Sequence, residues 1–219
     1  MALAAPLSDA DATVQSMPDA SPAKWHLAHT TWFFETMVLA AHSQNYQAFD
    51  ERFNFLFNSY YESVGERQPR PLRGLLTRPT LEEVRAYRAH VDAAMKALLQ
   101  LAPPESVLRI IELGCHHEQQ HQELLLTDIL HLFAQNPMRP AYRESVPLPV
   151  EPPDRTLTYR DFPGGLFEMG HDGSEFAFDC EGPRHAVQIE PFRLADRLVT
   201  NREWIEFIAD DAFPPLSPR

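Results

Sequence analysis

The sequence contains few cysteines, few basic residues and no long hydrophobic run, and each shortage excludes a class of protein. Two cysteines, Cys115 and Cys180, cannot form a disulfide framework, which favours a reducing cytoplasm. No apolar run reaches the roughly 18 residues of a membrane-spanning helix, and the N-terminus lacks the basic and apolar regions of a signal peptide. The 19 basic against 31 acidic residues give a net charge of −12. Such a surface repels phosphate, so we expect neither nucleic-acid nor membrane binding.

Glycine is also scarce in the first three quarters of the chain, and this uneven distribution divides the sequence. Five of the 8 glycines follow residue 163, and twelve of the 20 prolines follow residue 136. We predict a mainly α protein, with a helical bundle over residues 8–137. A proline-rich linker follows over 138–160, and an incomplete α+β segment follows over 161–219.

Three long helices are predicted in the first part. The first begins at the N-cap Ser21 and extends to about residue 44. The second follows the capping box Thr80–Glu83, and the third extends from about 106 to 135. A further short helix is expected between 49 and 78. The second helix has its core-facing stripe at Leu81, Val84, Tyr87, Val91, Met95 and Leu98. The third has apolar residues at Val107, Ile110, Leu113, Leu124, Leu125, Ile129 and Leu132, and its stripe facing the bundle interior includes Leu113 and Leu124.

The last part changes to a strand-like pattern. Residues 164–170 and 186–190 read as strands, and 192–194 extend the second one. The capping box Thr200–Glu203 then predicts a helix. A unit of roughly 55 residues with nothing to cover its sheet is marginal alone. We therefore interpret it as the opening of a larger domain.

The third predicted helix carries a pair of histidines with metal-binding spacing. His117 and His121 are four residues apart, so they stand about 40° apart around the helix axis and about 6 Å along it. Glu123 is rotated about 200° from His121 and points away from this face. Asp128 is on the right face but two turns further on, which suggests a hydrogen bond to a ligand at most. His131 lies about 21 Å from His117, too far to bind the same ion.

A third ligand must then come from another helix. His29 lies on the apolar side of the first predicted helix, whereas His26 is displaced by about 60° and faces a substrate or the linker. Cys115 is rotated away from His117 and is interpreted as a small packing residue. The histidines either bind a metal or are satisfied within the core, since an unpaired buried polar group costs roughly 1–3 kcal/mol. Three nitrogen ligands suit iron, zinc, copper or nickel.

A basic loop stands out in this acidic protein. Arg67, Arg70, Arg73 and Arg78 fall within twelve residues. Arginine binds carboxylates in a bidentate fashion, so the loop is either a clamp for an acidic small molecule near the metal or a partner for the protein's own acidic residues.

Three motifs together resemble the ergothioneine-biosynthesis sulfoxide synthases (EgtB-type). They are Ser21–His29, Asn58–Arg67 and His117–Glu123. The resemblance implies a DinB-like four-helix bundle followed by the start of a formylglycine-generating-enzyme-like (sulfatase-modifying-factor) domain. Its motifs in the second part are Gly164-Gly165, Glu181–His185 and Val199–Glu203.

The resemblance also implies a chemistry. Members of the family hold a non-haem Fe(II) with three histidines, which by position are His29, His117 and His121. They use O₂ to join a thiol, cysteine or γ-glutamylcysteine, to the imidazole of hercynine as a sulfoxide. Arg67 and Arg70 fall where the family binds its thiol substrate.

The family's second domain is much longer, and it supplies a catalytic tyrosine and much of the hercynine pocket. The catalytic residues are therefore expected in a complementing C-terminal domain, and this chain alone is expected to be inactive. Two alternatives remain: an ovothiol-type synthase that acts on histidine, and a catalytically dead metal-binding module.

Overall fold

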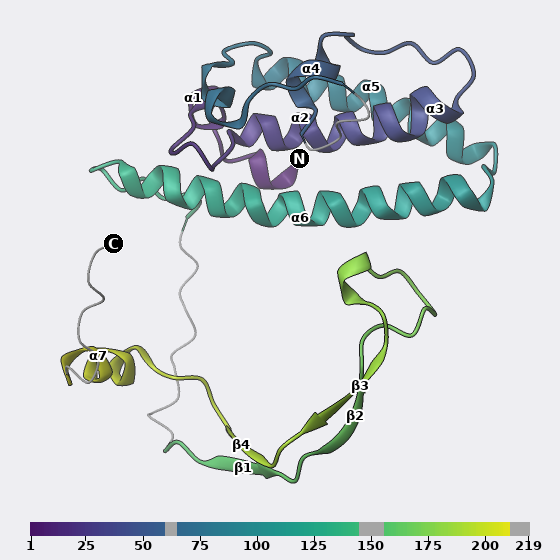
Figure 1. The fold of residues 1–219 in the computed structure, drawn as a ribbon. Coiled ribbons are helices and arrows are strands. Elements are labelled where there is room, and N and C mark those ends of the chain that lie inside the picture. The colour runs from purple at the N-terminus through teal and green to yellow at the C-terminus, as the bar shows by residue number, and fades with distance from the viewer. Residues whose placement is uncertain (60–64, 145–155, 211–219) are drawn as a thin grey trace. The chain divides into compact units, whose positions relative to one another are not determined.

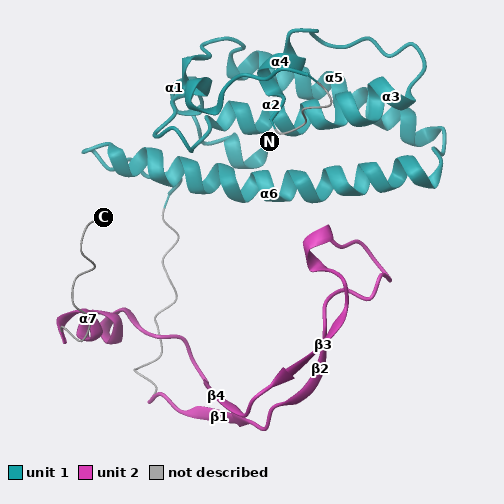
Figure 2. Cartoon of the chain, viewed as in Figure 1, with its two compact units in different colours: residues 1–146 teal, residues 147–219 magenta. Residues whose placement is uncertain are grey.

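The computed structural model describes residues 1–59, 65–144 and 156–210, which fall into two compact units, Met1–Val146 and Pro147–Arg219 (Figure 2). About half of the predicted linker 138–160, residues 145–155, lies outside the described residues. None of the described helices is long and apolar enough to cross a membrane.

Unit 1 is a helical bundle, as predicted. Its elements are η1 (Ala2–Ala4), α1 (Asp9–Thr13), α2 (Ala23–Phe33), η2 (Phe34–Leu39), α3 (Ala40–His42), α4 (Phe53–Phe57), η3 (Arg70–Leu75), α5 (Leu81–Gln100) and α6 (Glu105–Gln135). The helix α2 packs against both α5 and α6 (Figure 1). The expected short helix between 49 and 78 is present as α4, and η3 is a 3₁₀ segment in the same range.

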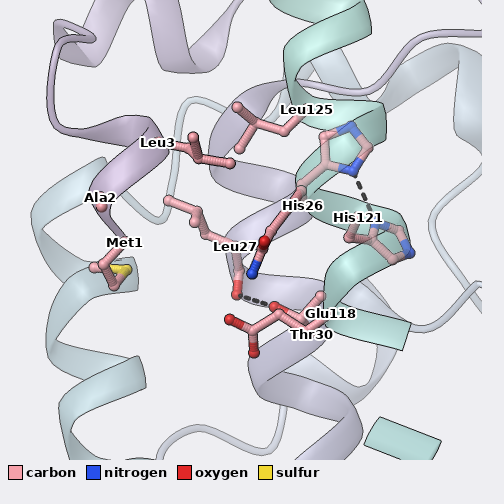
Figure 3. Close-up of a pocket in the computed structure, with 10 residues that line it drawn as sticks. Met1, Ala2, Leu3, His26, Leu27, Thr30, Glu118, His121 and Leu125 are labelled. Carbon is pink, nitrogen blue, oxygen red and sulfur yellow. Dashed lines mark hydrogen bonds between the residues drawn. The ribbon is translucent and has the colours of Figure 1, made fainter. Parts of the chain in front are cut away.

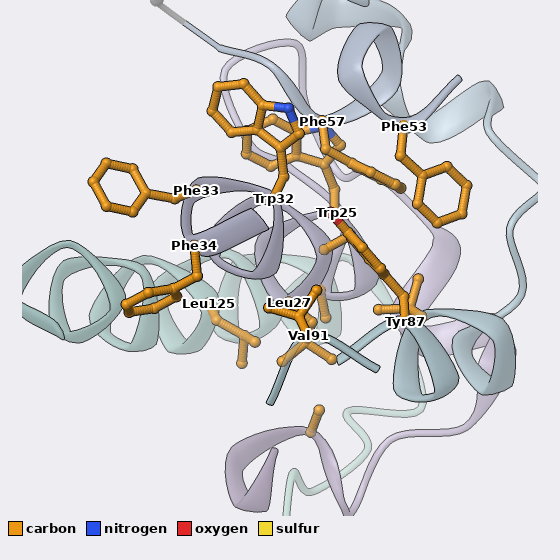
Figure 4. Close-up of a cluster of buried hydrophobic side chains, with 14 of the residues drawn as sticks. Trp25, Leu27, Trp32, Phe33, Phe34, Phe53, Phe57, Tyr87, Val91 and Leu125 are labelled. Carbon is orange, nitrogen blue, oxygen red and sulfur yellow. The ribbon is translucent and has the colours of Figure 1, made fainter. Parts of the chain in front are cut away.

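The central element of unit 1 is α2, whose eleven residues are all buried. Aromatic side chains from α2 and α4 share the buried core with Tyr87 of α5 (Figure 4), and the Phe53 ring meets those of Phe57 and Tyr87 edge to face. The first predicted helix begins one residue later than expected, with Pro22 rather than Ser21 as the N-cap. The Ser21 hydroxyl instead accepts a hydrogen bond from the Arg73 guanidinium at 2.9 Å.

A π-helical turn, η2, interrupts the regular helix after Phe33. Its Glu35 is buried and accepts hydrogen bonds from three groups: the Tyr46 hydroxyl at 2.7 Å, the Tyr87 hydroxyl at 2.5 Å and the Phe49 N–H at 3.0 Å. A buried carboxylate needs such donors, because an unpaired buried charge is strongly destabilising. The hydrophobic pattern does not predict this interruption.

The two long helices α5 and α6 differ in how well the hydrophobic pattern predicted their buried sides. On α5 the buried residues are the six predicted ones. On α6 the prediction is wrong at Leu113 and Leu124, which are 39% and 47% exposed. The reason is that α6 meets the bundle along a narrow line centred on Gly114, Leu125 and Ile129.

The described part of unit 2 contains two antiparallel strand pairs, a short 3₁₀ helix and one α-helix. Its elements are β1 (Tyr159–Phe162), β2 (Gly165–Met169), η4 (Asp179–Glu181), β3 (His185–Ile189), β4 (Phe192–Ala195) and α7 (Asn201–Ala209). The strand β1 pairs with β4, and β2 pairs with β3. The strand β1 was not predicted, because its residues overlap the proline-rich stretch that we took as linker. None of the described residues of unit 2 is buried.

Candidate metal centre

Three histidines from two helices meet inside unit 1. One ring nitrogen each from His29, His117 and His121 lies within 4.8 Å of the other two. The ring centroid of His29 is 4.9 Å from that of His117 and 4.7 Å from that of His121. The two α6 rings are 4.7 Å apart. The packing of α2 on α6 therefore brings together the three histidines that the motifs singled out, and leaves Glu123 exposed outside the cluster.

The three imidazoles are neutral at physiological pH. Burial lowers the pKa of His29 to about 3, that of His117 to about 4 and that of His121 to about 2. The cause is the loss of hydration, which disfavours the protonated ring. Each ring therefore keeps one nitrogen lone pair, as a metal ligand requires.

Hydrogen bonding fixes the orientation of His29. Its Nδ1 lies 2.6 Å from the Phe57 carbonyl oxygen. A carbonyl only accepts, so Nδ1 carries the proton and Nε2 carries the lone pair. The indole ring of Trp25 stacks on the imidazole with centroids 4.6 Å apart and planes at 13°.

Within the described part of the chain, His117 lacks a hydrogen bond that its burial would require. The Nδ1 atom of His117 is buried and has no hydrogen-bond partner among the described residues. Buried polar atoms are nearly always satisfied, so an exception calls for an explanation. An ion held by three neutral imidazoles fits this donor set, and the residues present are suited to a transition metal.

A fourth histidine contacts the cluster. The Nδ1 atoms of His26 and His121 are 2.8 Å apart (Figure 3). The Nε2 of His26 lies 2.9 Å from Asp128 Oδ2. His26 is almost fully buried, and it lines the cavity beside the three histidines. Asp128 therefore contacts His26 and not one of the three clustered histidines directly.

A cavity of about 340 Å³ opens beside the three histidines. Arg70 and Arg73 line it together with Ser59. A neighbouring cavity of about 300 Å³ is lined by Arg67, Arg70, Arg73 and Ser59. Arg70 therefore lies at the histidine cavity, whereas Arg67 is exposed and lines only the neighbouring one.

Arg73 is a site residue that the sequence did not single out from its loop. It is buried, and its guanidinium lies 3.4 Å from the centre of the Trp25 ring. It donates hydrogen bonds to Ser21 Oγ at 2.9 Å and Ser59 Oγ at 3.4 Å. Its spacing of three residues from Arg70 is the sequence feature that could have pointed to it. Arg73 therefore brings a positive charge to the cavity wall and ties together segments distant in the sequence.

Two further expectations concern residues outside the cluster. Cys115 is exposed, so its interpretation as a packing residue is wrong. His131 accepts or donates a hydrogen bond with Ser16 Oγ at 2.8 Å and takes no part in the histidine cluster. Within the motif Asn58–Arg67, residues 60–64 lie outside the described residues.

Comparison with known proteins supports the resemblance drawn from the motifs. The chain is 31% identical over 208 residues to the hercynine oxygenase of Mycolicibacterium smegmatis, covering 94% of this chain and 46% of that protein. It is 28% identical to the hercynine oxygenase of Mycobacterium tuberculosis, covering 94% of this chain and 47% of that protein. The chain thus spans about half the length of the curated relatives it matches. The DinB superfamily model matches residues 1–125, and the chain belongs to this superfamily.

Proposed function

We propose that this chain holds Fe(II) through His29, His117 and His121 and forms the metal-binding part of an O₂-dependent sulfoxide synthase of ergothioneine biosynthesis. The observation that carries the proposal is the cluster of three neutral imidazoles beside a cavity lined by arginines. The similarity to hercynine oxygenases supports the choice of hercynine as the imidazole substrate. Since the chain spans about half of those relatives, the activity of the whole protein belongs to this proposal.

The donor set explains the choice of ion class. Three histidines without a thiolate or carboxylate leave coordination positions open for exogenous ligands, as in oxygen-activating iron sites. When bound, iron would supply the activation of O₂ and of the substrate thiolate. The overall reaction joins the thiol sulfur to an imidazole carbon, and O₂ provides the sulfoxide oxygen and the oxygen of one water molecule.

The arginines fit the second substrate. Cysteine and γ-glutamylcysteine carry carboxylates, and a guanidinium binds a carboxylate with two parallel hydrogen bonds. We assign this role to Arg70 at the histidine cavity and to Arg67 at its neighbour. The buried Arg73 adds a fixed positive charge between them.

The second unit is assigned by motif alone. We propose that residues 161–219 belong to a formylglycine-generating-enzyme-like domain, and that residues completing the hercynine pocket come from a complementing C-terminal part. The described cavity at the histidines is lined by unit 1 residues.

The test combines metal binding with oxygen consumption. The metal-free protein is titrated anaerobically with Fe(II), and O₂ uptake is then measured with hercynine and γ-glutamylcysteine, with mass spectrometry of the product. His121→Ala is expected to abolish stoichiometric iron binding, whereas His131→Ala, on the same helix, is expected to retain it. Absence of iron binding by the wild-type protein would reject the site.

The same assay separates the alternatives. Turnover with histidine in place of hercynine would identify an ovothiol-type synthase. Tight metal binding without turnover, even when the second half of a hercynine oxygenase is added, would identify a metal-binding module.

A further inference from the structure

His26 and Asp128 connect the candidate metal centre to the backbone through a chain of hydrogen bonds. We propose that this pair positions His121: it holds the ring in the tautomer with the proton on Nδ1, so that Nε2 is the metal-binding atom. The inference rests on the proposed metal site, and it assigns a role to two residues outside the three-histidine cluster.

The hydrogen bonds from Ser21 through Asp128 and His26 to His121 form a continuous series that is protected from solvent. Ser21 donates its backbone N–H to Asp128 Oδ2 at 2.8 Å, and the same oxygen lies 2.9 Å from His26 Nε2. The Nδ1 atoms of His26 and His121 are then 2.8 Å apart. The His26 side chain is 4% exposed and that of Asp128 is 15% exposed. Figure 3 shows the ring of His26, from α2, reaching across to His121 on α6.

The chemistry of the groups fixes each proton. A carboxylate only accepts hydrogen bonds, so His26 must carry its proton on Nε2. The His26 side chain is only 4% exposed, which disfavours a second proton on its ring, so its Nδ1 is an acceptor. The Nδ1 of His121, at hydrogen-bond distance from that acceptor, must then be the donor. Only Nε2 of His121 retains a lone pair.

His29 and His121 each have an acceptor for the Nδ1 proton, but the two acceptors are of different kinds. At His29 a backbone carbonyl, that of Phe57, takes the Nδ1 proton directly. The helix α6 offers no such carbonyl to His121, because carbonyls inside a helix accept from its own N–H groups. A side chain from α2 supplies the acceptor instead, and Asp128 orients that side chain. Partners of this kind typically contribute 10- to 100-fold to metal affinity.

Two substitutions at position 26 separate the roles of its ring nitrogens. In His26→Asn the amide oxygen takes the place of Nδ1 and still accepts from His121. In His26→Gln the amide reaches Asp128, but no acceptor remains where Nδ1 was. We expect roughly a 10- to 100-fold loss of Co(II) and Fe(II) affinity in His26→Gln. The loss should be clearly smaller in His26→Asn, and absent in the control His131→Asn. Affinity is measured by titration under anaerobic conditions.

Equal losses in the two His26 variants would mean that the ring acts by packing alone, and would overturn the inference. So would affinities that match the wild-type protein in both. Thermal unfolding of the metal-free variants shows whether each one is folded.

A second readout needs neither metal nor variants. Long-range proton–nitrogen NMR of the metal-free, histidine-labelled protein reports which nitrogen of each neutral ring carries the proton. We expect Nε2–H at His26 and Nδ1–H at His121. The opposite tautomer at His121 would overturn the inference even if the protein binds metal. Conversely, failure of the wild-type protein to bind metal would reject the proposed function, while the expected tautomers would still support the hydrogen-bond chain.

Discussion

Lys24 is a residue whose position costs stability. It is 3% exposed, and its Nζ has no hydrogen-bond partner among the described residues. Burial lowers its pKa, which shows the penalty on the charged form. Leaving a polar group buried without a partner costs about 1–3 kcal/mol. Lys24→Met keeps the length of the side chain and removes the amine. We expect it to raise the free energy of unfolding by about 1 kcal/mol or more, measured by urea denaturation.

The control for this substitution is Lys96→Met, at an exposed position of α5, which should leave stability nearly unchanged. A loss of stability in Lys24→Met would show that the amine makes a favourable interaction in solution.

Sequence spacing predicted that the histidines would lie together, but it did not predict which other residues contact them. The spacing of His117 and His121 on one helix face is a local property, so the sequence contains it. The contact of His26 with His121 joins residues 95 apart in the chain. It depends on how α2 is rotated against α6, which no local pattern specifies.

At the scale of secondary-structure elements, the start of α5 depends on a reciprocal pair of hydrogen bonds. Thr80 Oγ1 accepts from the Glu83 N–H at 3.1 Å, and Glu83 Oε2 accepts from the Thr80 N–H at 2.6 Å. Loss of such a cap costs about 1 kcal/mol. We expect Thr80→Ala to lower the free energy of unfolding by about that amount, whereas Thr77→Ala, at a nearby exposed position, should have little effect. Equal stability of the two variants in thermal unfolding would contradict this prediction.

The contact between α6 and the segment Phe33–Phe34 depends on Gly114. A Cβ at this position would lie 2.6 Å from Phe34 Cε1 and 2.9 Å from Phe33 Cε1. Both phenylalanines are buried, so they have little freedom to move away. Overpacking of this kind costs about 1–3 kcal/mol, which exceeds the roughly 1 kcal/mol that alanine gains over glycine in a helix. We expect Gly114→Ala to lower the melting temperature.

Metal affinity should fall as well in Gly114→Ala, because His117 lies one helical turn further along α6. Cys115→Ala, at the adjacent exposed position, is the matched control and should change neither property. An increase in melting temperature for Gly114→Ala would show that the two rings rearrange without cost.

Sequence patterns predicted elements well where one side of a helix is buried. The capping box and the three- and four-residue spacing located α5 and its buried residues. The same reasoning located the helix that begins with α2, but it did not predict that α2 is buried all round. It missed the π-helical turn η2 and the four-residue strand β1. These features are determined by tertiary contacts.

At the scale of the whole molecule, the buried histidines make stability depend on pH. Their pKa values in the folded protein lie at about 4 or below for His29, His117 and His121, against about 6.5 in the unfolded chain. Between these values the unfolded state binds more protons, so stability must decrease as pH falls. We expect the metal-free protein to lose stability from about pH 6.5 towards pH 4. Each histidine contributes at most about 1.4 kcal/mol per pH unit.

The measurement is urea denaturation at a series of pH values. Replacing the exposed His185 by Asn should leave the slope unchanged. A stability that is constant between pH 7 and pH 5 would show that the rings are hydrated and protonate freely in the folded protein.

The complete burial of α2 has a consequence for how the site can change. His26 and His29 lie three residues apart on this helix, within a single turn, and one contacts the other's partner His121. Turning or sliding α2 to adjust one ring would displace the other at the same time. His29, a proposed ligand, and His26, which we propose orients His121, therefore move together, so substitutions around α2 should alter the arrangement of the histidine cluster.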